Sequence, residues 1–203
     1  MSFERRVRGL GIGLVVVLGV ALATEGFAES DGVAGYEYEG PYAQFGISIG
    51  QIDFDDVGSS NIDNNASGGF TLTGGYRFLP WLSGEAHFSY LGGGSVDVGS
   101  RQIGDGSFFA FTFGPKVYPL GAFPVEQFPE IVQPYATIQI GGGEFEVDGT
   151  SFDESAFMAR FILGFDFWFT DHIGAFVEGG GFATSEDDVD GVGVFTVGGQ
   201  YRF

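Results

Sequence analysis

The chain contains no cysteine and few basic residues, with 8 lysines and arginines among 203 residues. Without cysteine the protein has no disulfides and no thiol to carry a lipid. Three of the basic residues are Arg5, Arg6 and Arg8, so the chain after position 23 holds 5 basic side chains against 26 acidic ones. Such an anionic chain would repel the phosphates of nucleic acid, so no nucleic-acid partner is expected.

The first 23 residues have the order of a secretory signal peptide. Three arginines within the first eight residues precede fourteen uncharged residues, 10–23, which end in the small residue Ala23. A membrane-spanning helix needs about 20 apolar residues, so this stretch is too short to be an anchor. We therefore predict a signal peptide over residues 1–23, with cleavage after Ala23 or, as an alternative, after Ala28.

The next segment, residues 24–40, carries five acids interspersed with glycine and tyrosine and shows no strand period. We predict a flexible periplasmic lead-in there. After the leader no apolar run is long enough for a membrane helix, although the mean hydropathy of the chain is +0.16. Apolar contacts with lipid or with a core must therefore be made by segments that have another hydrophobic pattern.

Alternation supplies that pattern. Between residues 156 and 169 the odd positions are apolar, while the even positions include Arg160 and Asp166. A period of two over this length indicates a strand with one strongly apolar face. Eight segments share the pattern and are predicted as strands: 42–52, 68–78, 82–91, 106–118, 133–142, 156–169, 172–183 and 191–203.

The connections between these strands alternate in length. Long polar loops are predicted at 53–67, 92–105, 143–155 and 184–190, and short turns at 79–81 and 170–171. This arrangement is typical of outer-membrane barrels. The sequence therefore predicts an all-β fold over residues 41–203, an eight-stranded antiparallel up-and-down transmembrane β-barrel with a cleaved signal peptide. A soluble eight-stranded lipocalin is the rival fold.

One connection breaks the alternation. Residues 119–132 stand where a short turn is expected, but they form a long segment with three prolines and two phenylalanines. We expect the segment either to fold over the periplasmic mouth of the barrel or to contact a partner.

Charged residues within the strands lie on the faces opposite the aromatic rows. A charge facing lipid near the midplane costs roughly 2 to 4 kcal/mol for Arg or Lys, so these side chains should point into the lumen. Buried charges must pair or form hydrogen bonds. We predict a lumen polar network of Arg77, Glu85, His87, Lys116, Arg160, Asp166, Glu178 and Arg202, joined by Gln44, Thr73, Gln139, Thr196 and Gln200. The network either simply fills the barrel or, as the sharper alternative, lines a gated ion path.

Aromatic residues gather near the predicted strand ends, where outer-membrane barrels carry girdles at both lipid interfaces. The periplasmic girdle is predicted to contain Phe78, Trp81, Tyr118, Trp168, Phe169, Tyr201 and Phe203, and the outer one Phe70, Tyr90 and Phe182.

Three motifs resemble the OmpA/OmpX-like small outer-membrane β-barrels. They are the strand–turn–strand unit GGYRFLPWL at 74–82, its echo GFDFWFTDHI at 164–173, and the ending GGQYRF at 198–203. The resemblance implies that Tyr201 and Phe203 belong to a C-terminal assembly signal read by the barrel-assembly machinery. It also implies outer-membrane lipids and lipopolysaccharide as partners, and a monomer in the outer membrane of a Gram-negative cell. The long segment 119–132 departs from the family pattern.

Two groups of residues could form a functional site. His87 and Ser89 resemble the catalytic pair of lipid A deacylase barrels, but strand parity turns both into the lumen, away from lipid. The four long loops hold 15 acids, which could bind calcium or magnesium, yet the segment starting at Asp53 lacks the ligand spacing of an EF-hand. We therefore expect no catalytic, cofactor or metal site, with weak cation bridging to lipopolysaccharide as an open hypothesis.

The sequence therefore predicts an integral outer-membrane protein that is not an enzyme and that is porin-like in its fold. It would contribute to the cell envelope or to surface interactions through acidic extracellular loops. The alternatives are an enzyme acting on lipids of the outer leaflet and a narrow gated channel.

Overall fold

The computed structural model describes residues 35–54, 62–64, 66–98, 101–125, 128–147, 153–185 and 189–203. The predicted signal peptide and residues 24–34 lie outside these ranges. The described chain is nearly all strand: β1 (Gly40–Phe54), β2 (Ile62–Asn64), β3 (Ser67–Leu79), β4 (Leu82–Val98), β5 (Arg101–Val117), β6 (Val132–Val147), β7 (Asp153–Trp168), β8 (Ile173–Thr184) and β9 (Val189–Arg202), with one short helix, α2 (Pro119–Ala122).

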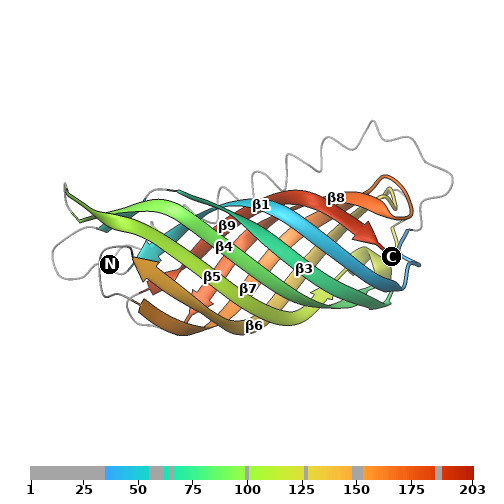
Figure 1. Ribbon diagram of the computed structural model, residues 1–203. Coiled ribbons are helices and arrows are strands. Elements are labelled where there is room, and N and C mark those ends of the chain that lie inside the picture. The colour runs from blue at the N-terminus through green and yellow to red at the C-terminus, as the bar shows by residue number, and fades with distance from the viewer. Residues whose placement is uncertain are drawn as a thin grey trace.

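Eight of the strands form a closed antiparallel barrel (Figure 1). Each strand pairs with its neighbour along the chain, and β1 closes the ring by pairing with β9, from Tyr42 opposite Arg202 to Asp53 opposite Gly191. Closure leaves no unpaired edge, which is how a sheet satisfies its backbone groups in lipid. The predicted eight-stranded up-and-down barrel is confirmed.

The two faces of the wall follow the alternation in the sequence. In β7, Phe157, Phe161 and Leu163 are at least half exposed on the outside, whereas Arg160 and Asp166 on the other face are buried. A wall with apolar side chains outside and charged ones inside is the reverse of a soluble barrel. The lipocalin alternative is therefore excluded by the direction of the side chains.

The strands extend further than predicted at the end that carries the long connections. The predicted loop 92–105 is mostly a continuation of the β4–β5 hairpin, in which Ser95 pairs with Asp105, and the short strand β2 pairs with the tip of β4. Beyond the lipid boundary neither face of a strand has to be apolar. The alternation that marks the other strands is therefore missing there, although the backbone ladder continues.

The prediction of the aromatic girdles is wrong for three residues. Tyr118, Trp168 and Phe182 are buried inside the barrel, while the other seven predicted members are exposed on its outer face. Trp168 is two residues beyond Asp166 and therefore shares its inward face. Aromatic residues near strand ends are expected in a girdle, but the alternation along the strand determines whether each ring points outward or into the lumen.

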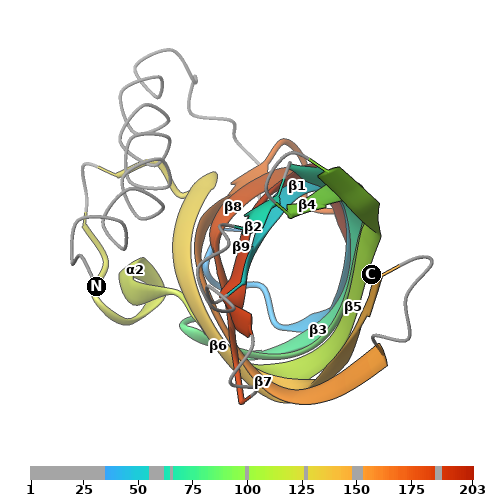
Figure 2. The ribbon, with the colours of Figure 1, turned by 90° about the vertical axis from the view of Figure 1, so that its left-hand side faces the viewer.

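The long connection after β5 contains α2. Figure 2, which looks along the barrel, shows α2 outside the ring of strands and not over its opening. Of the two predicted placements for 119–132, folding over the mouth is therefore wrong for α2. Within the described residues no helix is long and apolar enough to span a membrane.

Candidate functional site: the barrel lumen

The lumen holds two layers of side chains, a charged layer toward the short turns and an apolar layer toward the long connections. All eight residues of the predicted polar network are buried, as are the five uncharged polar residues expected to join them. The alternation of each strand brings them to the same side of the wall.

Lys116 lies at the centre of the charged layer. Its ammonium nitrogen is 3.1 Å from a carboxylate oxygen of Asp166 and 3.4 Å from one of Glu85, and it lies 3.7 Å from the centre of the Tyr135 ring. Two carboxylates and an aromatic face surround the cation, as a buried charge requires.

Three tyrosines complete the shell around the carboxylates. The hydroxyl of Tyr42 donates to Glu85 at 2.8 Å, that of Tyr118 to Asp166 at 2.9 Å, and that of Tyr135 to Glu178 at 2.8 Å. Sequence reasoning missed these tyrosines as members of the network. Strand parity contained the information, because Tyr42 shares the inward face of Gln44 and Tyr118 that of Lys116.

Glycine makes room for two of these rings. A Cβ atom on Gly75 would lie 2.4 Å from the Cζ atom of Tyr42, and one on Gly164 would lie 2.5 Å from the Cζ atom of Tyr135. Each of these strands therefore needs glycine where a tyrosine from a neighbouring strand crosses it.

Arg160 joins the charged layer to the rest of the network. Its guanidinium forms a 2.6 Å ion pair with Glu178 and donates to the side-chain oxygen of Gln139 at 3.2 Å. The amide of Gln139 donates in turn to Glu85 at 3.2 Å. Gln139 thus connects the Arg160–Glu178 ion pair to Glu85, which contacts Lys116.

Two further arginines occupy the short-turn end of the lumen. Arg77 and Arg202 both donate to the side-chain oxygen of Gln133, at 2.8 and 3.3 Å. Arg77 also lies over the ring of Tyr118 at 3.9 Å, and Arg202 over that of Trp168 at 3.5 Å. Stacking on aromatic faces and sharing an amide oxygen stabilise these guanidinium groups.

Two tyrosines that precede β1 cover this end. The ring of Tyr36 lies 5.7 Å from the guanidinium of Arg77, and that of Tyr38 lies 4.6 Å from the guanidinium of Arg202. The Tyr36 hydroxyl donates to the backbone oxygen of Val132. Burial is the main cause that raises the pKa of both tyrosines above their ordinary value.

His87 stands apart from the ionic contacts. Its Nδ1 atom lies 2.7 Å from the hydroxyl of Thr73, and within the described ranges the Ser89 hydroxyl has no hydrogen-bond partner. Both side chains are buried in the lumen. A nucleophile and base must contact each other and the substrate, and neither condition holds for this pair.

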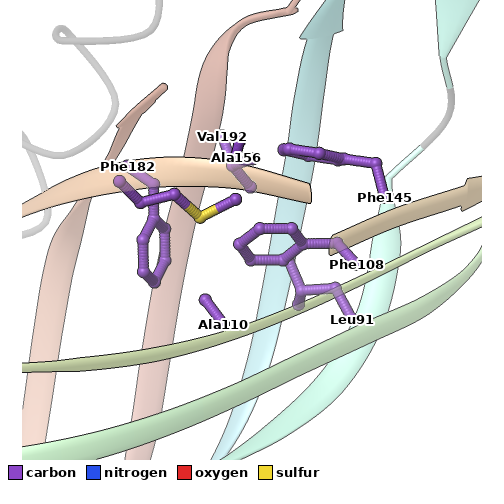
Figure 3. Packing of buried hydrophobic residues seen from close by; sticks show 8 residues of the cluster. Leu91, Phe108, Ala110, Phe145, Ala156, Phe182 and Val192 are labelled. Atoms are coloured by element: carbon purple, nitrogen blue, oxygen red, sulfur yellow. The ribbon is translucent and has the colours of Figure 1, made fainter. Parts of the chain in front are cut away.

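Sequence reasoning did not predict the apolar layer, whose side chains pack together inside the barrel as Figure 3 shows. The ring of Phe108 lies 5.0 Å from that of Phe145 and 5.2 Å from that of Phe182. Six strands contribute to the layer, whose members are Leu91, Phe108, Ala110, Phe145, Ala156, Met158, Phe182 and Val192. These eight side chains form a buried apolar layer inside the barrel.

A barrel with this topology, an apolar exterior and a filled polar lumen is found in one class of membrane protein. A family model described as "Outer membrane protein beta-barrel domain" matches residues 13–203. The chain belongs to this family. The protein is thus an outer-membrane barrel, and since short turns face the periplasm in this class, the short-turn end is its periplasmic end.

Solved structures of three bacterial proteins are similar to this outer-membrane barrel. OprG from Pseudomonas aeruginosa is 15% identical with a TM-score of 0.61, and the match covers 84% of this chain and 99% of that one. Neisserial surface protein A is 13% identical with a TM-score of 0.57, covering 80% and 97%. Ail of Yersinia pestis, solved with the heparin analogue sucrose octasulfate, is 21% identical with a TM-score of 0.51, covering 81% and 99%. At these identities the likeness shows the fold. No curated protein matches the chain.

Among the acidic side chains of the predicted long loops, the structure describes those of Glu144 and Glu146, and the others lie outside the described part of the chain. In the part of the outer-membrane barrel that the structure describes, no group of three or more potential ligands is placed to hold a metal ion.

Proposed function

We propose that this protein is a closed, non-enzymatic outer-membrane barrel whose acidic loops serve envelope integrity or surface interaction. The filled lumen is the observation that carries the proposal. An ion crossing the barrel would have to pass both the apolar layer around Phe108 and the buried ion pairs of Lys116. The interior of an eight-stranded barrel is just wide enough for its own side chains.

Conductance tests the closed state directly. The purified protein, inserted in planar bilayers at high salt, is expected to give no stepwise currents, whereas a porin in the same set-up gives them. Stable currents from the wild-type barrel would overturn the proposal and support the gated ion path.

The absence of enzymatic activity is supported by the burial of His87 and Ser89 in the lumen, away from lipid. Cells that produce the protein should contain lipid A with the same acyl chains as cells that produce the His87→Ala variant. Mass spectrometry of extracted lipid A measures this. Deacylation that depends on His87 would make the protein an enzyme.

The proposed surface role is based on the negative charge of the long connections. The four long connections hold 15 acids, and Arg101 is the basic residue among them. Lipopolysaccharide is itself anionic, so we infer that divalent cations bridge the loops to it. Calcium should raise the thermal unfolding midpoint in lipopolysaccharide-containing bilayers. A variant with Glu186→Gln, Asp187→Asn, Asp188→Asn and Asp190→Asn should lose most of the increase. An unchanged wild-type midpoint would contradict the bridging.

Biogenesis and assembly state complete the proposal. Tyr201 and Phe203 are exposed on the outer face at the periplasmic end, which suits recognition by the barrel-assembly machinery. The ring closes within one chain, which supports a monomer. Phe203→Ala should slow insertion by the purified machinery, while the Phe169→Ala control should not.

A further inference from the structure

The connection after β5 exposes apolar side chains that the lumen and the loops do not explain. Phe123 is 78% exposed, the highest value among the large apolar side chains in the described residues, and Val125 is 51% exposed. The seven residues 119–125 carry no charge in a chain whose net charge is −19. We call residues 119–125 the α2 segment.

The α2 segment is held against the barrel wall. The backbone nitrogen of Tyr118 donates to the oxygen of Trp81 at 2.9 Å, and that of Phe123 donates to the oxygen of Pro119 at 2.9 Å. Gly121 packs so closely on the β3–β4 turn that a Cβ atom there would lie 2.1 Å from the oxygen of Pro80. The contacts of Tyr118 and Gly121 place α2 beside the β3–β4 turn, and Figure 2 shows it outside the ring of strands.

The surface next to the α2 segment is the lipid-facing belt. Phe78, Leu79 and Trp81, which form or flank the β3–β4 turn, are exposed on the outer face of the barrel. Because α2 packs on this turn, the segment extends the belt sideways at the same end of the barrel. An apolar surface continuous with the lipid-facing belt, and without charge, has the chemistry of a lipid contact.

We propose that the α2 segment inserts into the boundary between head groups and acyl chains of the periplasmic leaflet, with Phe123 and Val125 as the inserted side chains. Pro119 and Pro124 lack a backbone N–H, so two donors are absent from a region where unpaired donors are costly. The occupant of this surface is phospholipid. The proposal depends on the outer-membrane location and is independent of the proposed function.

Spin labelling tests the proposal in the full-length protein. The chain has no cysteine, so Phe123→Cys and Val125→Cys each give a single labelling site. Ile138→Cys, on the outer face of β6, is the lipid reference, and Asp171→Cys, in the exposed β7–β8 turn, is the aqueous reference. Power saturation in phosphatidylethanolamine–phosphatidylglycerol vesicles compares the access of oxygen and of a water-soluble nickel chelate to each label.

The labels at 123 and 125 are expected to be more accessible to oxygen than to nickel, with depths between those of the two references. Nickel access equal to that at Asp171 would overturn the proposal, because the segment would then lie in water. Dipolar broadening at 123 that vanishes on dilution with unlabelled protein would also overturn it, since a second copy would then occupy the surface. The change in migration on a detergent gel after heating verifies that each variant is folded.

Discussion

Arg202 stacks on Trp168, with 3.5 Å between the guanidinium carbon and the centre of the ring. The pair joins β9 to β7 across the lumen, with β8 between these strands in the wall. A cation that lies inside a membrane protein, on the face of a buried indole, depends on that ring for its local stabilisation.

Replacing Trp168 tests this dependence. Trp168→Ala should lower the free energy of unfolding by about 3–5 kcal/mol, because it removes a large buried side chain and uncovers Arg202. Trp168→Phe should cost much less, since a ring remains and the indole nitrogen has no hydrogen-bond partner within the described part of the chain. Urea unfolding followed by the gel shift measures both. Phe169→Ala, the exposed neighbour, is the matched control, and an equal loss there would contradict the prediction.

Removing the central cation should be more damaging than removing the pair. Lys116→Met leaves Asp166 and Glu85 buried without their cation, and should destabilise the barrel by roughly 3–5 kcal/mol. The double variant Lys116→Met with Asp166→Asn should regain part of that loss, because it removes one uncompensated charge. A double-variant cycle in urea measures the coupling. Additive losses would show that the two side chains do not stabilise each other.

Two adjacent glycines should respond differently to the same change. Gly75→Ala should destabilise the barrel by about 1–3 kcal/mol, because the new methyl group meets the Tyr42 ring. Gly74→Ala should be neutral or slightly stabilising, since a Cβ atom there has no neighbour within 4 Å. The midpoint of the heat-dependent gel shift measures both. Equal effects would mean that the Tyr42 ring moves aside at little cost.

The contact of Tyr36 and Tyr38 with the barrel should weaken in alkali. Burial raises the pKa of both phenols in the folded protein above the unfolded value of about 10. Their contribution is therefore complete below pH 10 and is lost as the pH rises through the folded values. A spin label at Glu37→Cys should become mobile above about pH 10, and the transition should disappear when both tyrosines are Phe. A label whose mobility stays constant until the barrel itself unfolds in alkali would contradict this.

The alternation of the sequence was enough to predict the fold and the direction of the charged side chains. A charge on the lipid-facing side is costly, so the outward positions of a strand within the membrane are apolar, as they are in β7. That constraint ends at the membrane boundary. Apolar alternation therefore does not reveal the extension of the β4–β5 hairpin over 92–98 and 101–105.

The interior was harder to predict because no rule of similar strength acts there. The packed lumen accepts charged, tyrosine or phenylalanine side chains, provided that volumes and hydrogen bonds match. The apolar layer around Phe108 was missed for this reason. Tyr118 and Trp168 were placed in the girdle although parity pointed inward, because aromatic residues near strand ends are common in girdles.

The pairing of β1 with β9 has a consequence for the order of folding. All other neighbouring strands in the ring are adjacent along the chain, so their hairpins need only local loop closure. The pairing of β1 with β9 places Tyr42 opposite Arg202. Contacts between residues so far apart in the sequence are expected to form late, because closing a long loop is entropically costly. Until β1 pairs with β9, both strands expose unpaired backbone N–H and C=O groups. An assembly factor that shelters two edges at once would therefore speed the final step of folding.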